Sequence, residues 1–161
     1  MSQKFRLDKA GYINRNKKIS FKFNGKKYFG YKGDTLASAL LANGIHLVGR
    51  SFKYHRPRGF IGAGVDEPNA TVQLNKGDKT EPNVVATTIE LVEGLEAKSQ
   101  NCWPFVSFDL GAINNLLNKF LPAGFYYKTF MWPKNFWHKI YEPFIRKAAG
   151  LGVASLKPDP D

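Results

Sequence analysis

The sequence is almost without cysteine, because Cys102 is the single thiol among its 161 residues. One thiol cannot form an internal disulfide, and it cannot supply a structural zinc site, which takes four Cys or His ligands. The three histidines share no metal-ligand spacing. This scarcity excludes a disulfide-stabilised scaffold, argues against an oxidising compartment and predicts a cytoplasmic protein.

Long apolar runs are also missing. No stretch approaches the roughly 18 residues of a membrane-spanning helix. The opening residues, MSQKFRLDKAGY, lack the apolar segment of a secretory signal. Motifs of common active sites, such as G-x-S-x-G, the P-loop and S-x-x-K, do not occur. We therefore expect no contact with a membrane and no catalytic residue.

Acidic residues are scarce in the first third of the chain. Residues 1–60 hold 14 Lys and Arg but only two Asp and Glu, and this end carries the whole imbalance behind the net charge of +11. A basic surface attracts nucleic acid, or equally an acidic protein surface.

The stretch RSFKYHRPR, residues 50–58, interleaves bases with aromatic rings. Three interpretations stay open: a solvated basic loop, an interface with another subunit, or a single-stranded nucleic-acid site. No RNP, KH or helix-turn-helix pattern supports the third. The candidate interface residues are Arg50, Lys53, Tyr54, His55, Arg56 and Arg58.

Local signals near the start predict a hairpin followed by a helix. Residues 19–31 alternate apolar and polar side chains around an Asn-Gly pair at 24–25, which is typical of a type I′ turn. Residues 33–44, GDTLASALLANG, predict a helix of about ten residues, with Asp34 as its N-cap and Gly44 as its left-handed C-cap.

Two further strands are expected at 70–74 and 84–92, so the whole order indicates a small α+β domain. The loop before them contains Gly62-Ala63-Gly64, half of a dinucleotide-binding fingerprint. Glu67 stands where the third glycine belongs, and Pro68 follows where a helix would have to run. We therefore exclude a Rossmann site here.

Aromatic residues are concentrated after residue 100. Residues 120–144 contain ten of them, and four prolines between 104 and 143 leave room only for short helices, expected at 109–121 and 135–150. Such a segment can bury a large area against a neighbour. The candidate contact residues are Tyr126, Tyr127, Trp132, Phe136 and Trp137.

Residues 33–74, GDTLASALLANGIHLVGRSFKYHRPRGFIGAGVDEPNATVQL, closely resemble the start of the α subunits of heterotetrameric sarcosine oxidases. The segments NCWPFVSFD (101–109) and LPAGFYYKTFMWP (121–133) are similar to a connecting segment of the same subunits. The wider family includes α subunits of amine and proline dehydrogenases, whose front domain is a β-grasp, [2Fe-2S] ferredoxin-like module. The resemblance implies such a domain at 10–98 and an extension of short helices and irregular chain at 99–161.

The resemblance also locates four former cluster ligands. In cluster-bearing relatives the loop runs C-G-M-G-V-C-x-x-C, and a later P-N-V-x-A-C supplies the fourth thiolate that such a cluster needs. The corresponding residues here are Ile61, Asp66, Asn69 and Thr87. We therefore expect a ferredoxin-like domain without its cluster, with the loop collapsed around Ile61.

By the same resemblance, the chain is expected to be the N-terminal, non-catalytic module of an α subunit, inactive alone, since it stops at Asp161 where a nucleotide fingerprint would follow. Its partners would be the remaining α domains and the β, γ and δ subunits of a complex that demethylates sarcosine to glycine. FAD, FMN, NAD and tetrahydrofolate would bind elsewhere in that complex, and none in this chain. The alternative is a stand-alone basic β-grasp module that binds nucleic acid or another polyanion, although nucleic acid is the less expected partner.

Overall fold

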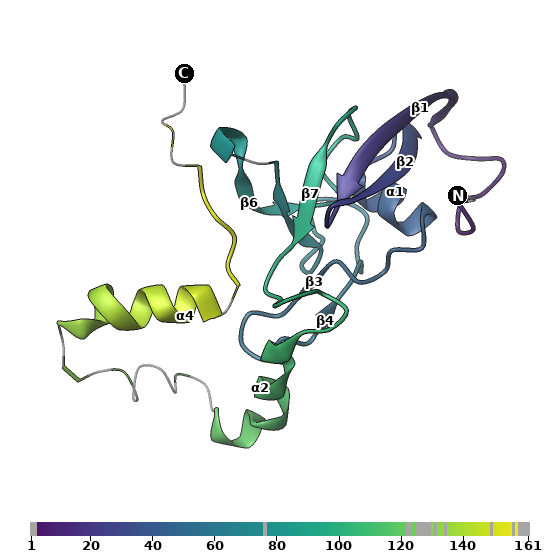
Figure 1. Cartoon of the computed structure of the whole chain (residues 1–161). Helices are drawn as coiled ribbons and strands as arrows, with labels where there is room; N and C mark the ends of the chain where they lie inside the picture. Colours follow the sequence, from purple (N-terminus) through teal and green to yellow (C-terminus); the bar gives the residue numbers. More distant parts are fainter. Residues whose placement is uncertain are drawn as a thin grey trace.

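The computed structural model describes residues 3–75, 77–121, 124, 130, 132–133, 135–148, 150–155 and 157. Its centre is one mixed sheet of five strands, with a separate two-stranded ribbon beneath it (Figure 1). The sheet strands are β1 (Asn14–Phe23), β2 (Lys26–Lys32), β5 (Thr71–Leu74), β6 (Glu81–Val85) and β7 (Glu96–Ser99), and the ribbon is β3 (Gly49–Arg50) with β4 (Pro57–Arg58).

The strand order β2-β1-β7-β5-β6 places the first and last strands side by side at the centre of the sheet. β1 and β7 run parallel, and the other neighbouring pairs run antiparallel. The connection between hairpin and ribbon is helix α1 (Leu36–Ala42), which packs against the hairpin (Figure 1). A hairpin, a helix and a returning parallel strand form the β-grasp arrangement, so the expected α+β fold is confirmed.

The hairpin of β1 and β2 forms where the sequence predicts it, although β1 begins at Asn14, five residues before the predicted start. Asn24 and Gly25 both adopt positive φ angles, 50° and 78°, which is the geometry of a type I′ turn. On one face of β1 the side chains of Ile19, Phe21 and Phe23 are buried. The alternation therefore reports correctly which face of the strand meets the core.

Helix α1 begins one residue later than predicted, because its N-cap is Thr35 and not Asp34. The Thr35 hydroxyl accepts the N–H of Ser38 at 3.2 Å, while the Ser38 hydroxyl accepts the N–H of Thr35 at 3.0 Å. This reciprocal pair is a capping box, which satisfies two helix-end donors at once. Gly44 does follow the helix with a φ of +79°, as expected for the C-terminal position.

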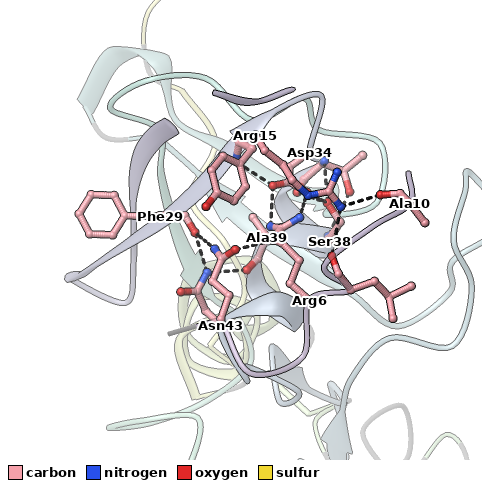
Figure 2. Close-up of polar contacts among 12 residues, drawn as sticks. Arg6, Ala10, Arg15, Phe29, Asp34, Ser38, Ala39 and Asn43 are labelled. Atoms are coloured by element: carbon pink, nitrogen blue, oxygen red, sulfur yellow. Dashed lines mark hydrogen bonds and ion pairs between the residues drawn. The ribbon is translucent and has the colours of Figure 1, made fainter. Parts of the chain in front are cut away.

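Asp34 has a different role, as a buried anchor for the N-terminal segment. Its carboxylate accepts two hydrogen bonds from the Arg6 guanidinium, at 3.0 and 2.7 Å, and one from the N–H of Tyr31 at 2.8 Å (Figure 2). The Ser38 hydroxyl donates a fourth, at 2.8 Å. Residues ahead of β1 therefore pack on the domain.

The predicted strand at 84–92 is wrong beyond Val85, where β6 ends. The following residues run past the start of α1, and the carbonyls of Ala86 and Ile89 accept the N–H groups of Ala37 and Leu36. Apolar side chains in this segment are buried, although the segment is not a strand of the sheet. Its carbonyl groups accept N–H groups at the start of the helix instead. β7, which the sequence did not suggest, supplies the missing central strand.

The core lies between the sheet and α1. Its largest fully buried side chains are Phe21, Leu36, Leu40, Leu91, Val48 and Val72. All of them precede residue 100, so the β-grasp domain closes its own core without help from the later segment.

After residue 100 the chain forms short helical pieces. A helical stretch follows Asp109, with 3₁₀ turns η2 (Leu110–Ala112) and η3 (Asn118–Phe120) around α2 (Ile113–Leu116). A π-helical turn, η4 (Trp137–Tyr141), continues into α4 (Glu142–Ala148). Both expected helices are thus present in broken form. None of the described helices has the length and apolar character that a bilayer crossing requires.

Candidate functional site

The four positions that the resemblance aligns with cluster ligands lie in or against the glycine loop, and none of them offers a thiolate. Ile61 is 77% exposed and Asp66 is also exposed. Asn69 accepts a hydrogen bond from Arg58 at 2.6 Å. Thr87 is buried and donates its hydroxyl to the carbonyl of Gly64 at 2.7 Å. Residue 87, at which the resemblance puts the fourth thiolate of cluster-bearing relatives, therefore contacts the loop.

Glu67 occupies the centre of this loop. Its side chain is only 3% exposed, and its carboxylate accepts four backbone N–H groups. One oxygen takes Ile61 and Gly62 at 2.6 and 2.5 Å, and the other takes Asn69 and Ala70 at 2.8 and 3.2 Å. The two ends of the loop are thereby joined through one carboxylate.

The expectation that the loop collapses around Ile61 is wrong. The Ile61 side chain is exposed and does not fill the loop. The charged side chain of Glu67 is buried at the centre of the loop instead. Burial raises the pKa of Glu67, but the four backbone donors together outweigh it, so that the pKa lies below its ordinary value of 4.5. The carboxylate is therefore ionised at neutral pH.

The residues of this loop do not fit a [2Fe-2S] cluster. Such a cluster takes thiolates, and each iron needs two soft ligands. Neither the loop nor residue 87 offers sulfur, and both oxygens of Glu67 are committed to backbone donors. Among the described residues, no three Cys, His, Asp or Glu side chains are grouped so that they could hold a metal ion.

Cys102 lies outside this loop. Burial raises the pKa of its thiol, Asp109 adds to the rise and Arg50 opposes it. A thiol with a raised pKa is a poor nucleophile at neutral pH. Cys102 is thus a half-buried free thiol of low reactivity.

A second polar cluster joins the basic stretch to the residues that follow the domain. Arg50 donates from Nε and Nη2 to the carbonyl of Val106, at 2.9 and 2.8 Å, and from Nη1 to the carbonyl of His55 at 3.0 Å. Its guanidinium therefore holds the start of the extension rather than facing solvent.

His55 and Asp109 form the buried centre of this cluster. His55 is 2% exposed and Asp109 8%, and their Nδ1 and Oδ2 atoms are 2.7 Å apart. A carboxylate can only accept, so the ring nitrogen carries the proton. The other Asp109 oxygen accepts the N–H groups of Trp103 and Gly111, at 2.9 and 3.1 Å. Sequence reasoning identified Asp109 only as the start of a helix.

The rest of the basic stretch also contacts the extension. The Tyr54 hydroxyl donates to the carbonyl of Leu121 at 2.9 Å, and Arg56 donates to Asn115 at 2.9 Å. The Lys53 carbonyl accepts from Asn114 at 3.2 Å. The six candidate residues thus lie together. Five of them contact residues 101–121 of this chain. The sixth, Arg58, contacts the glycine loop.

The described part of the aromatic segment is partly exposed. Trp132 is 81% exposed and Phe136 43%, whereas Trp137 is half-buried. Tyr126 and Tyr127 lie outside the described residues. Helix α4 is separated from the sheet in Figure 1, which agrees with this exposure.

More exposed apolar residues precede this segment, and sequence reasoning did not select them. They lie on both sides of Asp109 in the sequence, in the stretch WPFVSFDLGAINNLLNKF, in which such side chains recur. They are Trp103, Phe105, Phe108, Leu110, Ile113, Leu116 and Leu117, with exposures between 44% and 80%.

Comparison with known proteins gives a family match and several similar chains. Residues 16–102 match the model of the "2Fe-2S iron-sulfur cluster binding domain". The chain is 62% identical, over 98% of its length, to the sarcosine oxidase subunit alpha of Rhizobium meliloti (strain 1021), and 40% identical over 53% of its length to that of Corynebacterium sp. (strain U-96). It spans 16% and 9% of those two proteins.

One solved structure is also similar, the L-proline dehydrogenase from P. horikoshii. The likeness covers 57% of this chain and 17% of that one, with 28% identity and a TM-score of 0.42.

Proposed function

Because this chain belongs to the family of 2Fe-2S iron-sulfur cluster binding domains and carries no cysteine at the cluster positions, we propose that it is a non-catalytic assembly module of a sarcosine oxidase α subunit. It would form the N-terminal part of that subunit. The high identity to the Rhizobium meliloti protein supports the subunit type. Oxidation of sarcosine, and the binding of FAD, FMN, NAD and tetrahydrofolate, would belong to other domains and to the β, γ and δ subunits.

The observation that carries this proposal is the exposed apolar surface beyond residue 100. The domain core is complete without it, yet Trp103, Phe108, Phe120 and Trp132 are each at least 64% exposed. Large contiguous apolar patches on soluble proteins mark interaction sites. We infer that residues 103–120 and 132–144 pack on the following domain or on a neighbouring subunit in the cytoplasm.

The basic stretch is a poor candidate for the alternative role of polyanion binding. Arg50 and His55 are engaged inside the chain, and Arg58 holds Asn69. Arg56 is the exposed base of this stretch. The contacts of the stretch therefore support a role in fixing the extension.

The test compares the chain alone with the chain co-expressed with the rest of the α subunit of the Rhizobium meliloti relative. Alone, it is expected to bind a hydrophobic dye and to self-associate, because the apolar surface is uncovered. Co-expression should give a stable complex without dye binding, and Trp132→Ala with Phe136→Ala should weaken that complex. The isolated chain should produce no peroxide from sarcosine.

Arg56→Ala is the matched control, because Arg56 is exposed and its hydrogen bond to the extension, at Asn115, lies at the surface. It should leave the complex intact. A monodisperse, dye-negative monomer that binds single-stranded DNA with a steep salt dependence, and that loses this affinity in Arg56→Ala, would contradict the assembly role and favour the alternative.

A further inference from the structure

The glycine loop has the construction of an anion site that is already filled from within. Backbone N–H groups that point into one concavity bind anions well. Four such donors surround the Glu67 carboxylate, two from residues 61–62 and two from residues 69–70. The donors come from both ends of the loop, so the carbonyl groups of one backbone turn could not accept all four N–H groups.

Two of these donors belong to former ligand positions, Ile61 and Asn69. An iron–sulfur cluster with four thiolates is itself an anion, and hydrogen bonds to its sulfurs are part of such sites. The carboxylate thus has the charge sign and the acceptor role that the cluster has in such a site, and it meets the backbone of the same loop.

We propose that Glu67 is a built-in substitute for the lost cluster, a resident carboxylate that holds the loop closed without iron. This role concerns the folding of the loop and stands apart from the assembly role, so that either could fail alone. It also names the chemistry that the loop would accept once Glu67 is removed, namely a small carboxylate such as formate.

The loop is tied to the rest of the domain on two sides. Arg58, in β4, donates to Asn69, and Thr87 donates to the carbonyl of Gly64. The residue before Thr87, Ala86, accepts the N–H of Ala37 in α1, and Ala70, just before β5, is fully buried. Opening of the loop is therefore expected to disturb the domain and not only its surface.

The experiment is chemical rescue of Glu67→Ala, with Asp66→Ala as the matched control because Asp66 is an exposed carboxylate of the same loop. Thermal unfolding and amide hydrogen exchange are measured with and without formate. In Glu67→Ala the amides of Ile61, Gly62, Asn69 and Ala70 should exchange roughly 10- to 100-fold faster than in the unsubstituted chain. The midpoint of unfolding should fall by about 5 °C or more.

Formate should raise the midpoint of Glu67→Ala saturably and slow the exchange of these four amides, with no comparable effect on Asp66→Ala or the unsubstituted chain. Unchanged exchange in Glu67→Ala, or an equal effect of formate on all proteins, would overturn the proposal. If Glu67→Ala does not fold, Glu67→Gln replaces it. The Gln amide has the size of the Glu carboxylate but turns an NH₂ donor toward two of the backbone N–H groups. Amide exchange should therefore still accelerate, and formate should not slow it. Normal protection of the four amides in this variant would equally overturn the proposal.

Discussion

Replacement of Asp109 by alanine is expected to lower the free energy of unfolding by about 3 kcal/mol, the range found when one partner of a buried charge cluster is removed. Asp109 faces His55 and, at 3.6 Å, the Nε atom of Arg50, and it also accepts two backbone N–H groups. The substitution would leave His55 and the two N–H groups without this acceptor and would remove a nearby negative charge from Arg50. Urea unfolding of the purified variant measures the change.

The same variant should release the extension from the domain. Limited proteolysis is expected to cut between residues 101 and 121 much faster than in the unsubstituted chain, while residues 14–99 survive. Glu142→Ala is the control, since it removes an exposed ion pair with Arg146 and should cost only about 0.5 kcal/mol. A stability loss no larger than that of Glu142→Ala would show that the Asp109 cluster does not hold the extension.

Asp34→Ala is the second variant for which we expect a large loss, again about 3 kcal/mol. The side chain of Asp34 is 1% exposed, and its carboxylate binds Arg6 through two nitrogens as well as Tyr31 and Ser38. The variant leaves these donors unsatisfied near the start of α1. Urea unfolding gives the loss, and proteolysis should remove the residues ahead of β1.

Lys22→Ala provides the comparison for Asp34→Ala. Its ion pair with Glu96 has a similar length, 2.9 Å, but Lys22 is half-exposed, so its loss should cost no more than about 1 kcal/mol. Equal effects of the two substitutions would mean that burial of Asp34 adds nothing to the stability of the domain.

The hairpin could be predicted from the sequence because its signals are local. The Asn-Gly turn and the alternation around Phe21 and Phe23 are complete within a few residues. β7 could not be predicted in this way, since its residues EAKS carry no apolar alternation and low strand propensity. Pairing with β1, at Phe23 and Ala97, determines that strand.

For the segment after Val85 the sequence predicts a strand where none forms, the opposite of the missed strand β7. Its apolar residues are buried as a strand would bury them, but the backbone partners lie in α1, about fifty residues earlier. A sequence window cannot show where backbone hydrogen bonds go when the partner is distant.

The candidate site was predicted only in part. The family motif selected Thr87 as a ligand position, and in the structure its hydroxyl donates to the carbonyl of Gly64 in the glycine loop. Glu67 was visible in the sequence merely as a residue that breaks a glycine fingerprint, because its four donors meet only when the loop curls. The role of Asp109 could not be predicted for a similar reason, since its partner His55 lies 54 residues away in the chain.

The most direct test of the account is an iron analysis of the purified chain, combined with its thermal unfolding in the presence of a strong iron chelator. The account predicts a cooperatively folded protein with far less than one iron per chain and an unfolding midpoint that the chelator does not change, because Glu67 holds the loop. A content near the two irons of a [2Fe-2S] cluster, with its visible absorption and a midpoint that falls on chelation, would contradict it.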